Sequence, residues 1–208
     1  MKGEKSSSLL PPSKPLLIVL SGLSGVGKDT VLDGLRKSGI PAYISVSATT
    51  RARRPREKDG VDYYFITPEK FQMMIDSDQL LEWANVYGNR YGIPAEPVRQ
   101  ALKRGQDVIV KIDVQGAATI KKRVPQAVLI FLVTFSLAEL EQRLKKRRTE
   151  TTSELELRLK TAVKELDNIP MFDYIVVNRE GKIDRTIADI KAIITAEKCR
   201  AVPRVCDI

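Results

Sequence analysis

Short runs of apolar residues alternate along this chain with segments in which apolar residues recur at every third or fourth position. The runs predict buried strands, and the helical spacing predicts amphipathic helices that cover them. Strands are predicted at residues 16–21, 42–47, 108–112, 127–135 and 174–177. Helices are predicted at residues 28–37, 94–104, 115–122, 137–147, 153–169 and 183–194, with a short one after Pro68. Strands that alternate with helices favour an α/β fold with a parallel sheet.

Residues at two predicted helix starts support these boundaries. Thr67 and Pro68 predict a helix start, because threonine caps free amide groups and proline suits the first turn. Ser153 and Glu156 form a capping box for a helix that is predicted to end near Ile169.

The length of 208 residues fits a single domain with short appendages. Residues 1–15 are rich in serine, proline and lysine without periodicity, so they are predicted to form a flexible N-terminal arm. The domain is expected over residues 16–200, followed by a tail at 201–208.

The composition, with 43% hydrophobic and 29% charged residues, excludes a wholly disordered chain. The longest apolar run, residues 127–133, is too short to cross a bilayer, and the first residues do not form a signal peptide. Cys199 and Cys206 are the only cysteines, too few for a disulfide framework or a four-cysteine zinc site. We therefore expect a cytoplasmic protein with no membrane-spanning segment.

The charged residues narrow the chemistry further. The chain contains no histidine, which excludes every mechanism that needs an imidazole. Its formal net charge of +9 indicates an anionic partner, which could be a nucleic acid, a membrane surface or a phosphorylated small molecule.

The sharpest local motif is GLSGVGKDT at residues 22–30, between a predicted strand and a predicted helix. This is the context of a phosphate-binding P-loop, in which glycines let backbone amides converge and the lysine adds a full positive charge. The strict pattern has serine or threonine after Lys28, but here Asp29 stands there and Thr30 follows. The alternative reading is a glycine-rich turn with a solvated lysine.

Residues 45–65 form a second block, SVSATTRARRPREKDGVDYYF, with four arginines at positions 51, 53, 54 and 56. Taken alone, such a basic run is more typical of a nucleic-acid or localisation patch than of an enzyme site.

These two blocks do not stand alone. Together with LEWA at 81–84, GNRYG at 88–92, IDVQG at 112–116 and RRTET at 147–151, they resemble the guanylate kinase family in order and spacing. The resemblance extends from Leu16 to the last helix. It implies a three-layer P-loop fold with a central parallel sheet, a small acceptor-nucleotide-binding region at about 47–96 and a helical lid at about 137–168.

The resemblance also implies a reaction, ATP + GMP giving ADP + GDP with Mg²⁺, and dGMP as a second acceptor, in purine nucleotide metabolism. ATP and GMP are then the partners, and neither a nucleic-acid partner nor a membrane partner is expected. The acceptor is already anionic near neutral pH, so no general base is needed, which agrees with a chain without histidine.

The matching positions carry the family's roles. The implied donor-nucleotide site consists of Gly22, Ser24, Gly25, Val26, Gly27, Lys28, Asp29, Thr30 and Asn178. The implied acceptor site consists of Ser47, Arg51, Arg54, Tyr63, Glu82, Tyr91 and Asp113. The implied catalytic residues are Lys28, Arg147 and Arg158, and Thr30 is the expected Mg²⁺ contact, through water.

Within the acceptor site, Arg51 and Arg54 are implied to grip the phosphate with the two tyrosine hydroxyls, while Ser47 and Glu82 read guanine. Planar guanidinium groups suit a phosphate dianion. Without the resemblance, the two tyrosines could be packing residues and Glu82 a surface charge. Asp113 ends a predicted strand, where ligands bind in such sheets, but it could equally cap the next helix.

Three other functions stay open at this point: a catalytically inactive guanylate-kinase-like binding module, a nucleic-acid binder, and a kinase for a phosphorylated sugar. The presence of Lys28 and its glycines argues against the inactive module. One further departure concerns Ile93, which stands where the family often has serine or threonine to help read guanine.

Overall fold

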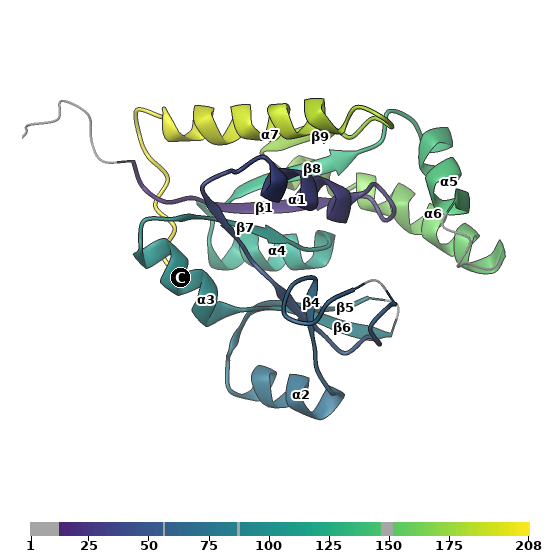
Figure 1. The fold of residues 1–208 in the computed structure, drawn as a ribbon, viewed down its shortest axis with the longest axis horizontal. Coiled ribbons are helices and arrows are strands. Elements are labelled where there is room, and N and C mark those ends of the chain that lie inside the picture. The colour runs from purple at the N-terminus through teal and green to yellow at the C-terminus, as the bar shows by residue number, and fades with distance from the viewer. Residues whose placement is uncertain (1–12, 56, 87, 147–151) are drawn as a thin grey trace, which may run out of the picture.

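The computed structural model describes residues 13–55, 57–86, 88–146 and 152–208, except for the side chains of 146 and 152–155 (Figure 1). Within these ranges no helix combines the length and apolar composition that a membrane span requires.

A five-stranded parallel sheet forms the centre of the fold, with the strand order β2-β7-β1-β8-β9. The strands are β1 (Leu17–Gly22), β2 (Ala42–Ile44), β7 (Asp107–Lys111), β8 (Val128–Val133) and β9 (Tyr174–Val177). Helices α1 (Lys28–Lys37) and α7 (Ile183–Lys198) cover one face, and α3 (Ala95–Lys103) and α4 (Val114–Arg123) cover the other (Figure 1). The predicted three-layer α/β fold with a central parallel sheet is confirmed.

The central strand β1 shows why both faces are covered. Ile18 and Leu20 belong to the hydrophobic cluster on the α1 and α7 side, whereas Leu17 and Val19 belong to the cluster on the α3 side. All four side chains are fully buried. Alternate side chains of a strand point to opposite faces, so a continuous apolar run needs helices on both sides.

A second, four-stranded sheet has the order β4-β3-β6-β5 and carries α2 (Pro68–Asp76). Its strands are β3 (Ser47–Thr49), β4 (Tyr63–Phe65), β5 (Leu80–Val86) and β6 (Asn89–Pro94). Sequence periodicity did not predict β4, β5 or β6. Strand β5 buries three consecutive residues at its start and β6 buries two, so neither alternates regularly, and β4 is only three residues long.

The strand predicted over residues 42–47 is wrong in extent. Pairing between β2 and β7 ends at Ile44, and the Ser45 amide donates the last hydrogen bond, to the Ile109 carbonyl at 3.0 Å. The chain then passes to the second sheet, where β3 begins at Ser47. Two short strands in different sheets look like one strand in the sequence.

The helix-end predictions have mixed outcomes. The Thr67 hydroxyl accepts a hydrogen bond from the Lys70 amide at 3.2 Å, as expected of a cap. Helices α5 (Leu137–Lys146) and α6 (Thr152–Leu166) form the region of the predicted lid. Helix α6 already includes Thr152, so it begins before the predicted capping residue, whose side chain lies outside the described set. It ends at Leu166 rather than near Ile169, where a 3₁₀ turn with Pro170 follows.

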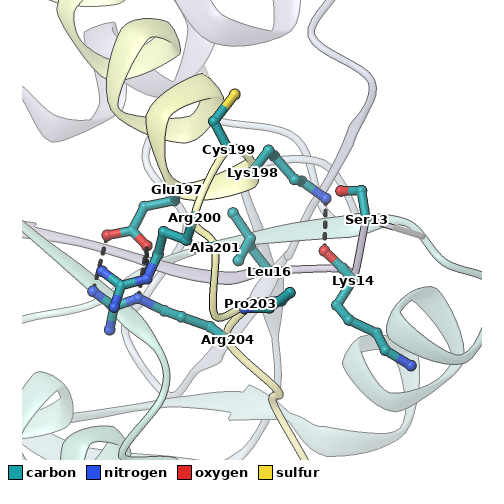
Figure 2. Close-up of a pocket in the computed structure, with 10 residues that line it drawn as sticks. All are labelled: Ser13, Lys14, Leu16, Glu197, Lys198, Cys199, Arg200, Ala201, Pro203 and Arg204. Atoms are coloured by element: carbon teal, nitrogen blue, oxygen red, sulfur yellow. Dashed lines mark hydrogen bonds and ion pairs between the residues drawn. The ribbon is translucent and has the colours of Figure 1, made fainter. Parts of the chain in front are cut away.

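The C-terminal tail is held against the central sheet (Figure 2). The Arg204 guanidinium donates two hydrogen bonds to the buried Glu197 carboxylate, at 2.8 and 2.9 Å, and Tyr174 donates a third at 2.7 Å. Beyond this anchor, Cys206 and Ile208 pack against the hydrophobic cluster on the α3 side. The lining of a cavity of about 380 Å³ beside the anchor includes Glu197, Arg200 and Arg204, and both arginines form ion pairs with Glu197.

Candidate functional site

A cavity of about 320 Å³ lies where the two sheets and helix α6 meet. Its lining includes residues that the sequence placed in separate roles: Ser24, Lys28, Ser47, Arg51, Arg54, Tyr63, Glu82, Tyr91, Asp113 and Arg158. The structure thus brings the lysine of the P-loop and the predicted acceptor residues into one space.

The P-loop connects β1 to α1 in the predicted strand–loop–helix context. Gly22, Gly25 and Gly27 have φ angles of 147°, 86° and 98°, in the region that favours glycine. A Cβ atom at Gly22 would overlap the Leu132 carbonyl, and one at Gly25 would lie 2.5 Å from the Leu144 side chain. Both the turn and its close packing therefore require glycine.

Helix α5 and strand β9 support this loop from behind. The Arg143 guanidinium and the Asn178 side-chain amide donate to the carbonyl of the buried Val26, at 2.7 and 2.8 Å. The Asn178 side chain also accepts a hydrogen bond from the Thr186 hydroxyl at 3.2 Å. These bonds fix the backbone shape that an anion-binding loop needs.

Lys28 points back into the loop. Its ammonium donates to the carbonyls of Gly22 and Leu23, at 2.7 and 3.2 Å. Burial lowers the pKa of Lys28, and the carboxylates of Glu165, Asp29 and Asp113 oppose that shift. The positive charge is thus partly desolvated, which strengthens its attraction for an anion.

Glu165 on α6 was missed by the sequence analysis. Its carboxylate accepts a hydrogen bond from the Ser24 amide of the P-loop at 2.8 Å. Burial raises the pKa of Glu165, although Lys28 lowers it. A carboxylate on a P-loop amide shows that this amide is available to an anion. Nothing in the helical charge pattern around Glu165 would have revealed this contact.

At the acceptor end, Arg51 and Arg54 are both bound to Glu57. The Arg51 guanidinium donates to this carboxylate at 2.7 Å, and the Arg54 amide donates at 2.8 Å. Burial alone would raise the pKa of Glu57, but these hydrogen bonds and charges lower it below its ordinary value. The Arg51 guanidinium also lies 5.6 Å from the centre of the Tyr63 ring, and that ring contacts Tyr91 edge-on.

Glu82 is a buried carboxylate on β5, 3% exposed, at the inner wall of the cavity. Burial and the neighbouring Asp113 raise its pKa to about 8. Ser47, on β3, is also buried and lines the same cavity. Asp113 caps the start of α4, as one of the two predictions had it, because its carboxylate accepts a hydrogen bond from the Gly116 amide at 2.8 Å. It also lines the cavity, so its role as a cap does not exclude the predicted role in binding.

Gly116 makes room for Glu82. A Cβ atom at this position would overlap the Glu82 carboxylate. We predict that Gly116→Ala pushes this carboxylate out of place and raises the KM of the acceptor nucleotide about tenfold to a hundredfold. Steady-state kinetics in both substrates would check this.

The donor nucleotide is expected at the P-loop end of the cavity, away from Gly116, so its KM should change less than about twofold. An equal rise in both KM values would contradict the proposed local displacement, and thermal unfolding would show whether the fold is retained.

Several predicted site residues do not line this cavity. Asp29 lines a smaller adjoining cavity of about 130 Å³ together with Tyr63 and Lys111. Thr30 is exposed on the first turn of α1, and Asn178 is buried below the P-loop. Arg147 lies outside the described residues, whereas Arg158 lines the cavity from α6.

Lys111 is the second residue that the sequence analysis missed. It is the last residue of β7, at the end of a parallel strand where ligands of such sheets bind, and that position could have identified it. Its side chain is 11% exposed and lines both cavities.

Comparison with known proteins agrees with this geometry. A family model described as guanylate kinase matches residues 14–197. A protein named guanylate kinase from Desulfitobacterium hafniense (strain Y51) is 50% identical over 185 residues, 89% of this chain and 92% of that protein. Guanylate kinase 2, chloroplastic/mitochondrial, from Oryza sativa subsp. japonica is 43% identical over 204 residues, 98% of this chain and 72% of that protein.

A solved structure extends the likeness to three dimensions. The crystal structure of guanylate kinase from Anaplasma phagocytophilum superposes with a TM-score of 0.76 at 31% sequence identity. The match covers 91% of this chain and 89% of that one.

Proposed function

Since this chain belongs to the guanylate kinase family and is therefore an enzyme that phosphorylates GMP with ATP, we propose that the cavity between its sheets holds GMP and that its P-loop holds the ATP phosphates. One observation carries this assignment. The arginines suited to a phosphate, the buried carboxylate suited to guanine and the P-loop lysine line a single cavity.

We assign the phosphate of GMP to Arg51 and Arg54, with hydroxyl groups from Tyr63 and Tyr91. The Glu57 carboxylate now accepts hydrogen bonds from the Arg51 guanidinium and from the Arg54 backbone amide. A phosphate dianion offers the same kind of acceptor with more charge, so it can take over these donors. The side chains of Arg51 and Arg54 line the cavity, which favours a nucleotide over the nucleic-acid reading of this basic block.

We assign guanine to Glu82 and Ser47. A carboxylate can accept two hydrogen bonds, from N1–H and the 2-amino group of guanine. Adenine lacks that pair of donors and would leave the ionised form of this buried carboxylate unsatisfied, so it should be rejected. This assignment also disfavours a kinase for a phosphorylated sugar, which has no use for a base reader.

The reacting oxygen of GMP is already anionic, so catalysis consists of alignment and neutralisation of charge. Lys28 and the P-loop amides stabilise charge on the moving phosphoryl group, and Arg158 adds charge from α6. Arg147 is proposed for the same task from the family resemblance. The inactive-module alternative is disfavoured because Lys28 and the glycine geometry of the loop are both retained.

The Thr30 hydroxyl and the Asp113 carboxylate offer oxygen atoms, which are the ligands that Mg²⁺ prefers. The ion also keeps several waters when it binds beside phosphates. We propose that Thr30 contacts the ion through water and that Asp113 lies near its water shell. Bound Mg²⁺ would neutralise charge on the phosphates of ATP. We also propose that Asn178 lies beside the donor nucleoside, since it supports the loop that binds the ATP phosphates.

We place the reaction in purine nucleotide metabolism, and the protein in the cytoplasm, where its two free cysteines would remain reduced. Coupled detection of ADP with GMP, dGMP, AMP, CMP and UMP offered separately tests the function. Turnover confined to the guanine nucleotides is expected, and equal turnover of AMP would refute the role of Glu82.

The raised pKa of Glu82 predicts a pH dependence of GMP binding. In the free protein the carboxyl is mostly protonated at pH 7, because its pKa is about 8. Two guanine N–H donors need the carboxylate, so binding releases a proton, and affinity must rise with pH. We expect a gain of about fivefold to tenfold between pH 7 and about 8.5, by linkage.

Calorimetric titration of GMP in two buffers with different ionisation enthalpies would measure the released proton. The matched control is Glu82→Gln, whose weak residual binding should not vary with pH over this range. A flat profile in the unsubstituted protein would contradict the prediction.

A further inference from the structure

Lys111 joins two parts of the molecule that the proposed function keeps separate. Its ammonium donates to the Asp29 carboxylate, on the first turn of α1, at 2.5 Å. It also donates to the Tyr63 hydroxyl, on β4, at 2.8 Å. One side chain from the end of β7 therefore connects the helix that follows the P-loop to the proposed acceptor site.

The surroundings keep Lys111 charged. Burial alone would lower its pKa, but the neighbouring Asp29 carboxylate and the Tyr63 hydroxyl raise it above its ordinary value. Tyr63 stays neutral, because burial raises its pKa although Lys111 opposes the shift. The pair is thus a lysine cation beside an intact phenol.

The direction of the hydrogen bond matters. An ammonium group only donates hydrogen bonds, so the Tyr63 oxygen must accept from Lys111. The phenol hydrogen then cannot point at Lys111 and is left to point elsewhere. Tyr63 and Lys111 both line the cavity that contains Arg51 and Arg54, which offers an anion as the acceptor for this hydrogen. The positive charge behind the oxygen also makes the O–H group a stronger donor.

We propose that Lys111, held in place by Asp29, is a positioning residue that orients the Tyr63 hydroxyl toward the phosphate of the acceptor nucleoside monophosphate. This inference rests on the proposed function, in which Tyr63 binds that phosphate. It also gives Asp29 a role, since the residue that departs from the strict P-loop pattern is the anchor of Lys111.

The test measures GMP binding by calorimetry without ATP and without Mg²⁺, so that a metal contact of Asp29 cannot contribute. Lys111→Met keeps the unbranched apolar stem of the side chain and removes its ammonium group. We expect GMP affinity to fall about tenfold, the effect of one hydrogen bond to a charged group. Guanosine has no phosphate, so its affinity, measured as competition with GMP, should stay within about twofold.

A double-mutant cycle tests the route of the effect. Tyr63→Phe should weaken GMP binding by a similar factor, and Lys111→Met should add little in that background, because the hydroxyl it orients is gone. Asp29→Asn, at an exposed position, should weaken GMP binding a few-fold in the same way. The matched control is Lys103→Met, which removes an exposed lysine at the end of α3 and should leave binding unchanged.

The proposal is overturned if Lys111→Met binds GMP like the unsubstituted protein, or weakens guanosine equally. Full additivity with Tyr63→Phe also overturns it, since Lys111 would then act on the phosphate directly. If Lys111→Met does not fold, Asp29→Asn decides the test, and an unchanged GMP affinity in that variant overturns the proposal. If the unsubstituted protein binds no GMP, the proposed function is refuted as well. If the unsubstituted protein turns over GMP normally, the proposed function stands, whatever the variants show about Lys111.

Discussion

Replacing Lys28 with methionine is expected to lower kcat for phosphoryl transfer about a thousandfold or more, while the fold is retained. The ammonium is the only side-chain cation within the P-loop itself, at residues 22–30, and it already lies against the loop carbonyls at 2.7 and 3.2 Å. Removing a preorganised charge from a transition state typically costs several kcal/mol. Coupled detection of ADP at saturating GMP and ATP would measure the loss.

The control for Lys28→Met is Lys37→Met, at the exposed C-terminal end of the same helix. It removes the same charge and keeps the helix, so its kcat should stay within about twofold of the unsubstituted value. Activity in Lys28→Met above about a tenth of the original would show that the lysine does not act on the phosphates. Equal losses in both variants would indicate a general effect of charge.

Glu82→Gln is expected to lower kcat/KM for GMP about a thousandfold and to leave ATP binding intact. The substitution preserves the shape of a side chain that is 3% exposed, but it replaces one acceptor oxygen with an NH₂ donor. That donor would face an N–H group of guanine, and a buried mismatch of this kind costs several kcal/mol. Steady-state kinetics with GMP and direct titration of ATP would separate the two effects.

A matched control for Glu82→Gln is Glu96→Gln, on the exposed face of α3. It should change neither kcat/KM for GMP nor the affinity for ATP. If Glu82→Gln retained GMP turnover, guanine would have to be read elsewhere. Loss of ATP binding would instead show that the substitution disturbs the whole cavity.

The sequence predicted those elements whose signals lie within a few neighbouring residues. The P-loop and α1 were predicted at their observed boundaries, because the glycines, the lysine and the helical spacing all act within about ten residues. The predicted strand at 174–177 and the Thr67 cap were likewise confirmed. Sequence patterns report such elements well, since their hydrogen bonds and φ angles are set by near neighbours.

Such local patterns did not predict the second sheet. Strand β4 is defined by its pairing with β3, and β5 by its antiparallel pairing with β6. The polar Glu82 inside β5 breaks the apolar pattern, because that position serves the cavity rather than the core. The family resemblance, rather than periodicity, indicated which of these residues would meet.

By itself the sequence determined that a phosphate-binding loop follows the first buried strand, that the core is a parallel sheet between helices, and that no imidazole takes part in the chemistry. Only the tertiary structure decided that Gly116 admits the Glu82 carboxylate, that Glu165 reaches the Ser24 amide across 141 residues, and that Lys111 reaches Asp29 across 82. The physical reason is that these contacts link elements far apart in the chain. Their geometry depends on how strands and helices pack, and no local pattern of residues encodes it.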